Sequence, residues 1–372
     1  MTLHLKGKAA SIETVIVGKV IKNIDDTITL IDKNGNERLV IYYGQLLGVP
    51  KNIPTLLLNS SSEVEKLKDE DILLVNEKGK VTILYQNESI HNTLFITDRC
   101  NSNCLMCSQP PKDRDDLDFY FEVNKELIQL LPKNLSSLGI TGGEPTLLGK
   151  RLPELLKLIT EFLPDTYIHI LTNGRSFAWK SVVKELAEVN NPNIVYGIPL
   201  YSDYYLSHDY IVQAKGAFNQ TVYGIHNAAR YGLRVEVRIV LHKQSYDRLF
   251  HLSEFIYMNM PFVEHIAFMG LEFTGYTPYN KKILDIEPSM FLNNLEKAIS
   301  FLSLNGMNVS IYNLQHCLVS EKLWKFLRPS ISDWKRGYLE ECNRCELKPK
   351  CGGVFTTSKK YSEDIKAITN HI

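Results

Sequence analysis

Several features that would assign this chain to other classes of protein are missing from its sequence. Lys plus Arg and Asp plus Glu both number 42, so the formal net charge is zero and no overall basic field exists to hold nucleic acid. No uninterrupted apolar run approaches about 18 residues, and the first ten residues lack a charged segment followed by an apolar core. We therefore expect a cytoplasmic protein with no membrane-spanning segment and no nucleic-acid partner.

Cysteine is also scarce, with seven in 372 residues, and the seven gather in two places. An odd number grouped in this way fits metal ligation in a reducing compartment better than a disulfide framework. The first group, Cys100, Cys104 and Cys107, has the spacing C-x3-C-x2-C. Three thiolates from one short loop suit three irons of a [4Fe-4S] cube and leave the fourth iron open to a small molecule.

Two other interpretations of this spacing remain open. The three cysteines could form a buried helical stripe, although Asn101, Ser102 and Asn103 between them favour caps and turns over helix interiors. They could also bind zinc, with a fourth ligand from elsewhere in the chain.

A second motif, Thr141-Gly142-Gly143-Glu144-Pro145, follows the apolar run at 135–140 and precedes a helical pattern at 152–162. The two glycines lack a Cβ and so allow a ligand to approach the backbone, and Glu144 can accept hydrogen bonds from an ammonium group. A Gly-Gly pair that stands alone after a strand is more often a structural turn than a binding site.

The pattern around these motifs predicts a mainly α/β protein of three domains, at residues 1–90, 91–287 and 288–372. Residues 1–90 read as a small β domain whose strands are expected at 14–17, 27–31, 39–43, 72–75 and 81–85. It is either a structural or partner-docking appendage or a domain that recognises a substrate leader.

From 93 to 272, apolar strands alternate with amphipathic helices six times, which predicts parallel βα units. The strands are expected at 94–97, 135–141, 167–172, 194–201, 235–241 and 266–271, and the helices at 121–131, 152–162, 179–189, 218–231 and 246–258.

The cysteine loop and the Gly-Gly-Glu-Pro motif together resemble the radical S-adenosylmethionine (SAM) superfamily. That resemblance implies a partial (β/α)6 TIM-type barrel with its chemistry at the carboxyl ends of the strands. It implies a SAM-binding [4Fe-4S] cluster on Cys100, Cys104 and Cys107, and contacts to the SAM amine from Gly142, Gly143 and Glu144. Residues expected near the rest of SAM are Thr172, Asn173, Ser202 and Arg238, with Met106 at the place where many members carry an aromatic residue against the adenine.

The second cysteine group lies near the C-terminus, at Cys317, Cys342, Cys345 and Cys351. The spacing C-x2-C-x5-C followed by Gly-Gly resembles the auxiliary-cluster segments called SPASM and twitch extensions. Four thiolates would ligate a second [4Fe-4S] cluster fully, and a structural zinc is the alternative.

The sequence around the first cysteine loop and after Cys351 is similar to that of the His-Xaa-Ser system radical SAM peptide maturases. The resemblance implies that the 5′-deoxyadenosyl radical from SAM modifies a ribosomally made precursor with His-Xaa-Ser repeats, and we favour an oxidative change such as a cross-link. It also implies a second radical SAM maturase, a small accessory protein and an electron donor such as flavodoxin or ferredoxin. Alternatives are an activase of a glycyl radical enzyme, a tRNA-modifying radical SAM enzyme and a non-catalytic zinc scaffold.

The stretch from Tyr204 to Tyr210 follows the fourth strand and is rich in aromatic side chains. Its interpretation is open between a loop that touches a peptide substrate, with His208 as a candidate for catalysis, and a surface turn leading to the next helix.

Overall fold

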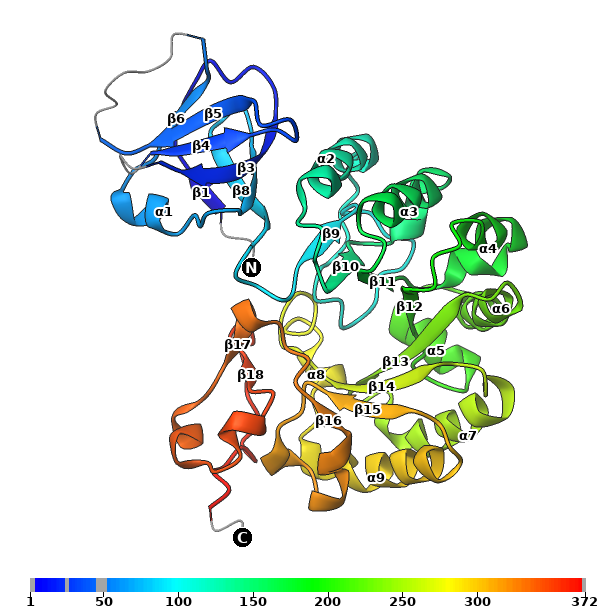
Figure 1. The fold of residues 1–372 in the computed structure, drawn as a ribbon. Helices are drawn as coiled ribbons and strands as arrows, with labels where there is room; N and C mark the ends of the chain where they lie inside the picture. The colour runs from blue at the N-terminus through cyan, green and yellow to red at the C-terminus, as the bar shows by residue number, and fades with distance from the viewer. Residues whose placement is uncertain (1–3, 24–26, 45–51, 370–372) are drawn as a thin grey trace.

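The computed structural model describes residues 4–23, 27–44 and 52–369. The chain forms a β domain, a large α/β barrel segment and a small C-terminal extension (Figure 1). Within the described ranges, no helix has the length and apolar character needed to cross a membrane.

The β domain is one eight-stranded sheet in the order β1-β8-β7-β3-β4-β5-β6-β2. Its two end strands are consecutive in sequence and are separated only by Gly7, whose N–H donates to the Gly79 carbonyl at 2.9 Å. The sheet therefore closes on itself around an apolar core. The strands are β1 (His4–Lys6), β2 (Lys8–Ala10), β3 (Ile16–Lys22), β4 (Ile28–Ile31), β5 (Glu37–Tyr42), β6 (Thr55–Leu57), β7 (Ile72–Val75) and β8 (Lys80–Tyr85), with the short helix α1 (Ser61–Glu65) after β6.

The second sheet also has eight strands, which are all parallel and run in sequence order from β9 at one edge to β16 at the other. All six expected strands are present, within two residues of their expected bounds. The strands are β9 (Thr93–Phe95), β10 (Ser137–Thr141), β11 (Tyr167–Leu171), β12 (Ile194–Pro199), β13 (Arg234–Leu241), β14 (His265–Gly270), β15 (Val309–Tyr312) and β16 (Leu327–Arg328).

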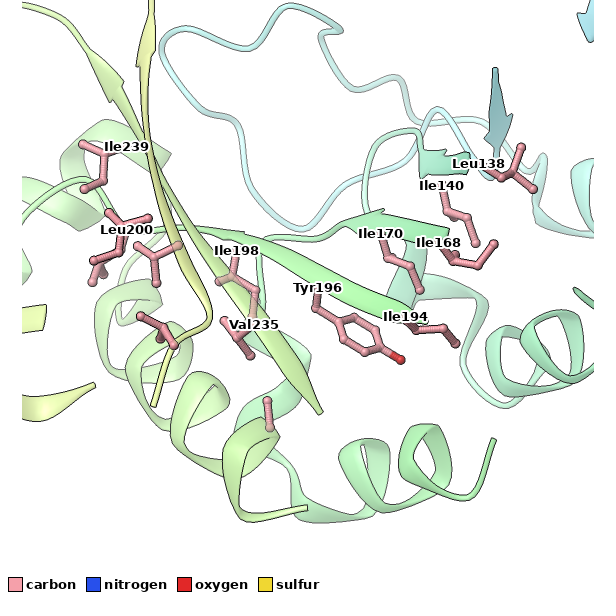
Figure 2. Close-up of a cluster of buried hydrophobic side chains, with 14 of the residues drawn as sticks. Leu138, Ile140, Ile168, Ile170, Ile194, Tyr196, Ile198, Leu200, Val235 and Ile239 are labelled. Carbon is pink, nitrogen blue, oxygen red and sulfur yellow. The ribbon is translucent and has the colours of Figure 1, made fainter. Parts of the chain in front are cut away.

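Helices cover the outer face of this sheet, as in a partial TIM-type barrel (Figure 1). Alternate residues of each strand point outward and pack against these helices, because side chains alternate along a strand. Figure 2 shows this layer, with Ile140, Ile170, Ile198 and Val235 among its buried side chains. The covering helices are α2 (Leu117–Leu130), α3 (Arg151–Phe162), α4 (Lys180–Ala187), α6 (Ala217–Arg230), α7 (Leu249–Asn259) and α9 (Pro288–Leu304), while α5 (Tyr205–Val212) and α8 (Lys281–Leu284) share an apolar cluster with the first cysteine loop.

The sheet is longer than the sequence predicted. After α9, strands β15 and β16 extend it beyond the six expected βα units, so the sheet crosses the domain boundary expected at residue 287. Pro288 occupies the first position of α9, where its fixed φ suits the helix and no amide donor is needed.

The β domain packs directly on helix α2 of the barrel. Val17, Leu74 and Tyr85 belong to the same buried cluster as Phe121 and Leu127 of α2. The two domains therefore share apolar surface and stabilise each other.

The extension after β16 is built on a two-stranded antiparallel hairpin, β17 (Arg336–Gly337) and β18 (Val354–Phe355). Three of the four C-terminal cysteines lie between these two strands. Asp333, just before the hairpin, accepts from the Ser89 hydroxyl at 2.8 Å and from the Ile90 N–H at 3.3 Å. The extension is thereby tied to the linker between the β domain and the barrel.

Candidate functional site

The first cysteine loop lies at the carboxyl end of β9, where the structure places it beside the ends of β10 and β11. Its three thiols are partly buried. Cys100 Sγ accepts from the Ser102 N–H at 3.4 Å, and the Asn173 side-chain amide lies 3.9 Å from it. N–H groups aimed at sulfur suit thiolates that ligate iron, so this donor set fits the expected cluster.

Burial raises the pKa of all three thiols. The pKa of Cys100 rises to about 11, mainly because burial disfavours its charged form and secondly because the Glu144 carboxylate is near. The pKa of Cys104 is raised by burial and by the other two cysteines, and that of Cys107 by burial. Bound metal cations would offset this penalty, since a coordinating thiol is deprotonated.

The Gly-Gly-Glu-Pro turn packs directly against this loop. A Cβ at Gly143 would lie 1.9 Å from the Arg99 carbonyl oxygen, and one at Gly142, whose φ is +144°, would lie 2.8 Å from the Thr97 carbonyl oxygen. The N–H groups of Gly143 and Glu144 donate to those same two carbonyls. The glycines are thus required for the close approach of β10 to the cysteine loop, whatever else they bind.

Glu144 is fully buried, and its carboxylate organises the strand ends. It accepts from Thr146 N–H (3.0 Å) and Oγ1 (2.7 Å), from Thr172 Oγ1 (2.6 Å) and from the Asn173 N–H (2.7 Å). Oε1 takes three of these hydrogen bonds and Oε2 takes one. These four hydrogen bonds match the total of about four that a carboxylate can accept. Contact between Glu144 and a SAM amine stays a prediction.

Met106, Ser202 and Arg238 lie in three different environments. Met106 is buried with Tyr201 in a small apolar cluster under the cysteine loop. Ser202 is also buried, and its hydroxyl accepts from the Tyr204 N–H at 3.1 Å. Arg238 points into the barrel and donates to Glu236 at 2.6 Å. Their contacts with SAM stay predictions.

Glu236 is the centre of a charged network inside the barrel. Besides Arg238, it lies 2.8 Å from His265 Nδ1 and 3.3 Å from His169 Nε2. Burial would raise the pKa of Glu236, but these histidines and the arginine outweigh it and hold the pKa well below its usual range. A Cβ at Gly197 would lie within 3.0 Å of both His169 and Arg238, so glycine provides the space for this network.

The aromatic stretch after β12 forms a helix, α5, where the sequence was read as a loop or turn. His208 is 1% exposed, stacks on the Tyr201 ring and accepts from the Tyr201 N–H at 3.3 Å through Nδ1. Burial lowers its pKa to about 4. His208 is therefore a packed core histidine with no exposed surface for catalysis.

Residues 271–280, between β14 and α8, hold the first cysteine loop from the opposite side. The Tyr276 N–H donates to the Cys107 carbonyl at 2.9 Å, and the Asn280 side-chain amide donates to the Leu105 carbonyl at 2.8 Å. Gly275 has φ of +59°, and a Cβ there would lie 2.2 Å from the Cys107 oxygen.

The same segment also contacts the C-terminal hairpin. Glu272 lies 3.2 Å from the Lys335 ammonium and accepts from the Thr357 hydroxyl at 2.6 Å. The Phe273 N–H donates to Ser358 Oγ at 2.9 Å. One short segment therefore connects the first cysteine loop with the extension that carries the second cysteine group.

The structure brings the four C-terminal cysteines around one small cavity of about 20 Å³, which Cys317, Cys342, Cys345 and Cys351 all line. Burial, and then the nearby Cys351 and Cys342, raise the pKa of Cys317 against the effect of a hydrogen bond from Lys366. In the described part of the chain, no three His, Cys, Asp or Glu side chains are arranged to hold one metal ion. The ligand roles in both groups stay predictions.

Arg175 is a site residue that the sequence analysis missed. Its guanidinium donates to the Asn101 carbonyl and to Ser102 Oγ (3.0 Å) in the cysteine loop, and to Gln220 Oε1 (2.7 Å) on α6. One sequence pattern indicated this contact. On α6, polar or small residues recur at helical spacing and share one face of the helix, at Gln220, Thr221, Gly224 and Asn227.

Comparison with known proteins agrees with this geometry. Residues 94–256 match the model of the radical SAM superfamily. An Fe-coproporphyrin III synthase from Methanosarcina barkeri is 32% identical over 155 residues, which are 40% of this chain and 36% of that protein. A GTP 3′,8-cyclase from Nautilia profundicola is 24% identical over 196 residues, which are 51% of this chain and 60% of that protein. The match thus spans about a third of the length of the synthase and about three fifths of the length of the cyclase.

Among solved structures, a histidine-tagged form of anSMEcpe with bound AdoMet superposes with a TM-score of 0.50 at 16% identity. The match covers 73% of this chain and 87% of that one. This likeness shows that the two share a fold.

Proposed function

We propose that this chain, whose residues 94–256 match the model of the radical SAM superfamily, cleaves SAM reductively and uses the resulting radical to modify a ribosomally made peptide. The observation that carries the proposal is the packing of the three-cysteine loop against the Gly-Gly-Glu-Pro turn at the carboxyl ends of parallel strands. In barrels of this kind, chemistry takes place at that end.

A [4Fe-4S] cluster bound here would supply one electron to SAM, and the 5′-deoxyadenosyl radical released together with methionine would abstract a hydrogen atom. Cys100, Cys104 and Cys107 would provide the thiolates. Glu144 and Asn173 hold the neighbouring strand ends in place, as their hydrogen bonds show. Gly142, Gly143, Thr172, Ser202, Arg238 and Met106 are the remaining candidates for SAM contacts.

The four C-terminal cysteines would hold a second [4Fe-4S] cluster. Their assembly around one cavity supports a shared ligand, and a structural zinc is the other candidate. In an oxidative cross-link, the substrate loses one hydrogen atom to the radical and then one electron and one proton. A cluster at the second cysteine group would take up that electron.

A peptide substrate is supported by the rim of α5. Tyr205, Leu206 and Tyr210 are about half exposed on this helix. The carbonyl of Ile211 at its end accepts from the Leu105 N–H at 2.9 Å, so the exposed aromatic rim adjoins the cysteine loop. Exposed aromatic groups beside a reactive site suit a ligand that offers several side chains. From the resemblance, we propose a precursor with His-Xaa-Ser repeats, a partner maturase and an external electron donor.

The similarity to a GTP 3′,8-cyclase favours a nucleotide substrate as the second candidate. The two are separated by incubating the reduced, reconstituted protein with SAM and either GTP or a His-Xaa-Ser precursor. Loss of one pair of hydrogens from the peptide supports the first candidate, and conversion of GTP alone contradicts it.

The first test is the iron, sulfide and zinc content after anaerobic reconstitution. Wild type should hold about eight irons, and both the Cys100/Cys104/Cys107→Ala and the Cys342/Cys345/Cys351→Ala variants about four. SAM cleavage should vanish only in the first variant. If wild type holds about four irons and one zinc, and the Cys100/Cys104/Cys107→Ala variant keeps only the zinc, the second cysteine group binds zinc and the second cluster is ruled out. If wild type holds zinc and no iron, the proposed radical function is wrong.

A further inference from the structure

Arg175 connects three parts of the fold through one side chain. It follows the end of β11, and its Nη1 donates to the Asn101 carbonyl and to Ser102 Oγ at 3.0 Å. Its Nε donates to Gln220 Oε1 at 2.7 Å. The guanidinium therefore fastens the first cysteine loop to helix α6.

The position of this side chain is fixed by close backbone packing. Gly174 has φ of +70°, and a Cβ at Gly224 of α6 would lie only 2.2 Å from the Gly174 carbonyl oxygen. Thr221 on the same helix donates to the Asn173 carbonyl at 3.2 Å. Because α6 lies against this turn, the side chain of Gln220 reaches Arg175 and orients its guanidinium. The planar N–H donors of Arg175 therefore point toward the cysteine loop.

Arg175 also brings a positive charge to the loop that carries the three thiols, because its guanidinium bonds to Asn101 and Ser102, which lie between Cys100 and Cys104. Each added electron makes a thiolate-ligated cluster more negative, so a nearby cation stabilises the reduced form more than the oxidised form. Net charge and hydrogen bonding around the sulfurs are what set the potentials of such clusters.

We propose that Arg175 is a positioning residue of the first cysteine loop, whose donors fix Asn101 and Ser102 and whose charge raises the reduction potential of the cluster. This inference rests on the proposed function, because it requires a cluster on Cys100, Cys104 and Cys107. It adds a residue that the cysteine motif does not contain.

The test compares four variants with wild type after anaerobic reconstitution. Arg175→Gln removes both the charge and the guanidinium donors, Arg175→Lys keeps the charge, and Gln220→Leu frees the side chain without changing its charge. Arg234→Gln is the matched control, since Arg234 also donates to a backbone carbonyl and to one side chain. Arg234 is the first residue of β13, whereas the cysteine loop lies at the carboxyl ends of the strands. The measurements are the first cluster's potential by redox titration with EPR detection, and iron release to a chelator.

We expect the ratio of reduced to oxidised cluster in Arg175→Gln to fall by about tenfold at a fixed potential, which corresponds to about 59 mV. Arg175→Lys and Gln220→Leu should keep the potential near wild type but release iron faster. Arg234→Gln should match wild type in both measurements.

Equal potentials and equal iron release in all proteins would overturn the inference and leave the proposed function intact. Equal lowering of the potential in Arg175→Gln and Arg175→Lys would refute the part played by charge. If Arg175→Gln fails to fold, Gln220→Leu still decides the anchoring role. A wild type without any cluster would overturn the proposed function and this inference with it.

Discussion

Replacing Gly275 with alanine should displace the first cysteine loop, although Gly275 lies far from that loop in sequence. The new Cβ would lie 2.2 Å from the Cys107 carbonyl oxygen and 2.7 Å from the Ser108 carbonyl carbon. These separations are about 1 Å or more below ordinary van der Waals contact. The Tyr276 N–H, which donates to that same Cys107 carbonyl at 2.9 Å, would move with the segment.

Two costs add in this variant. The positive φ of +59° disfavours alanine by about 1 kcal/mol, and forced overpacking costs about 1–3 kcal/mol more. If the backbone stays in place, the free energy of unfolding falls by about 2–4 kcal/mol. If the backbone yields, Cys107 moves and its iron is held less firmly.

The assay is iron content after reconstitution together with the midpoint of thermal unfolding. Gly306→Ala is the matched control, because Gly306 has φ of +77° but no atom within 4 Å of the place where a Cβ would lie. The control should lose about 1 kcal/mol and keep its iron. Gly275→Ala should lose more stability or about half of the iron. Identical iron content and stability in the two variants would refute the reasoning.

Three further predictions concern other parts of the chain. Since the pKa of Glu236 is held below its usual value, the contribution of its carboxylate to stability is present above about pH 5 and is lost as the pH falls. Glu236→Gln should therefore be less stable than wild type at pH 7 and should lose less stability toward pH 3 in denaturant titrations. An acid profile identical to that of wild type would contradict this. Glu144→Gln cannot accept all four hydrogen bonds and should lose about 2–4 kcal/mol together with its capacity to retain iron, whereas wild-type stability would argue against its buried role. Deleting residues 1–88 exposes the face of α2 and should lower the unfolding midpoint of the barrel, and the same truncated chain tests precursor binding, where unchanged affinity would exclude leader recognition by the β domain.

Much of the fold was readable because local pattern and tertiary role agree. Parallel strands buried on one or both faces are short apolar runs, and amphipathic helices separate them, so all six expected strands were located. The cysteine spacing and the Gly-Gly-Glu-Pro turn are likewise local signals, and the structure brings the two together. Helix α5 was missed because its residues are apolar around most of the helix and show no clear periodicity.

The chain therefore determined by itself the strand order, the two groups of thiols and the end of the barrel at which the first group lies. Only the tertiary structure decided that the sheet continues past Pro288, that Arg175 anchors the cysteine loop and that residues 271–280 connect this loop with the C-terminal extension. The reason is the range of the interactions involved. Spacing within a turn or a strand is written into neighbouring residues, whereas a contact such as Asn280 to Leu105 exists only because packing brings distant segments together.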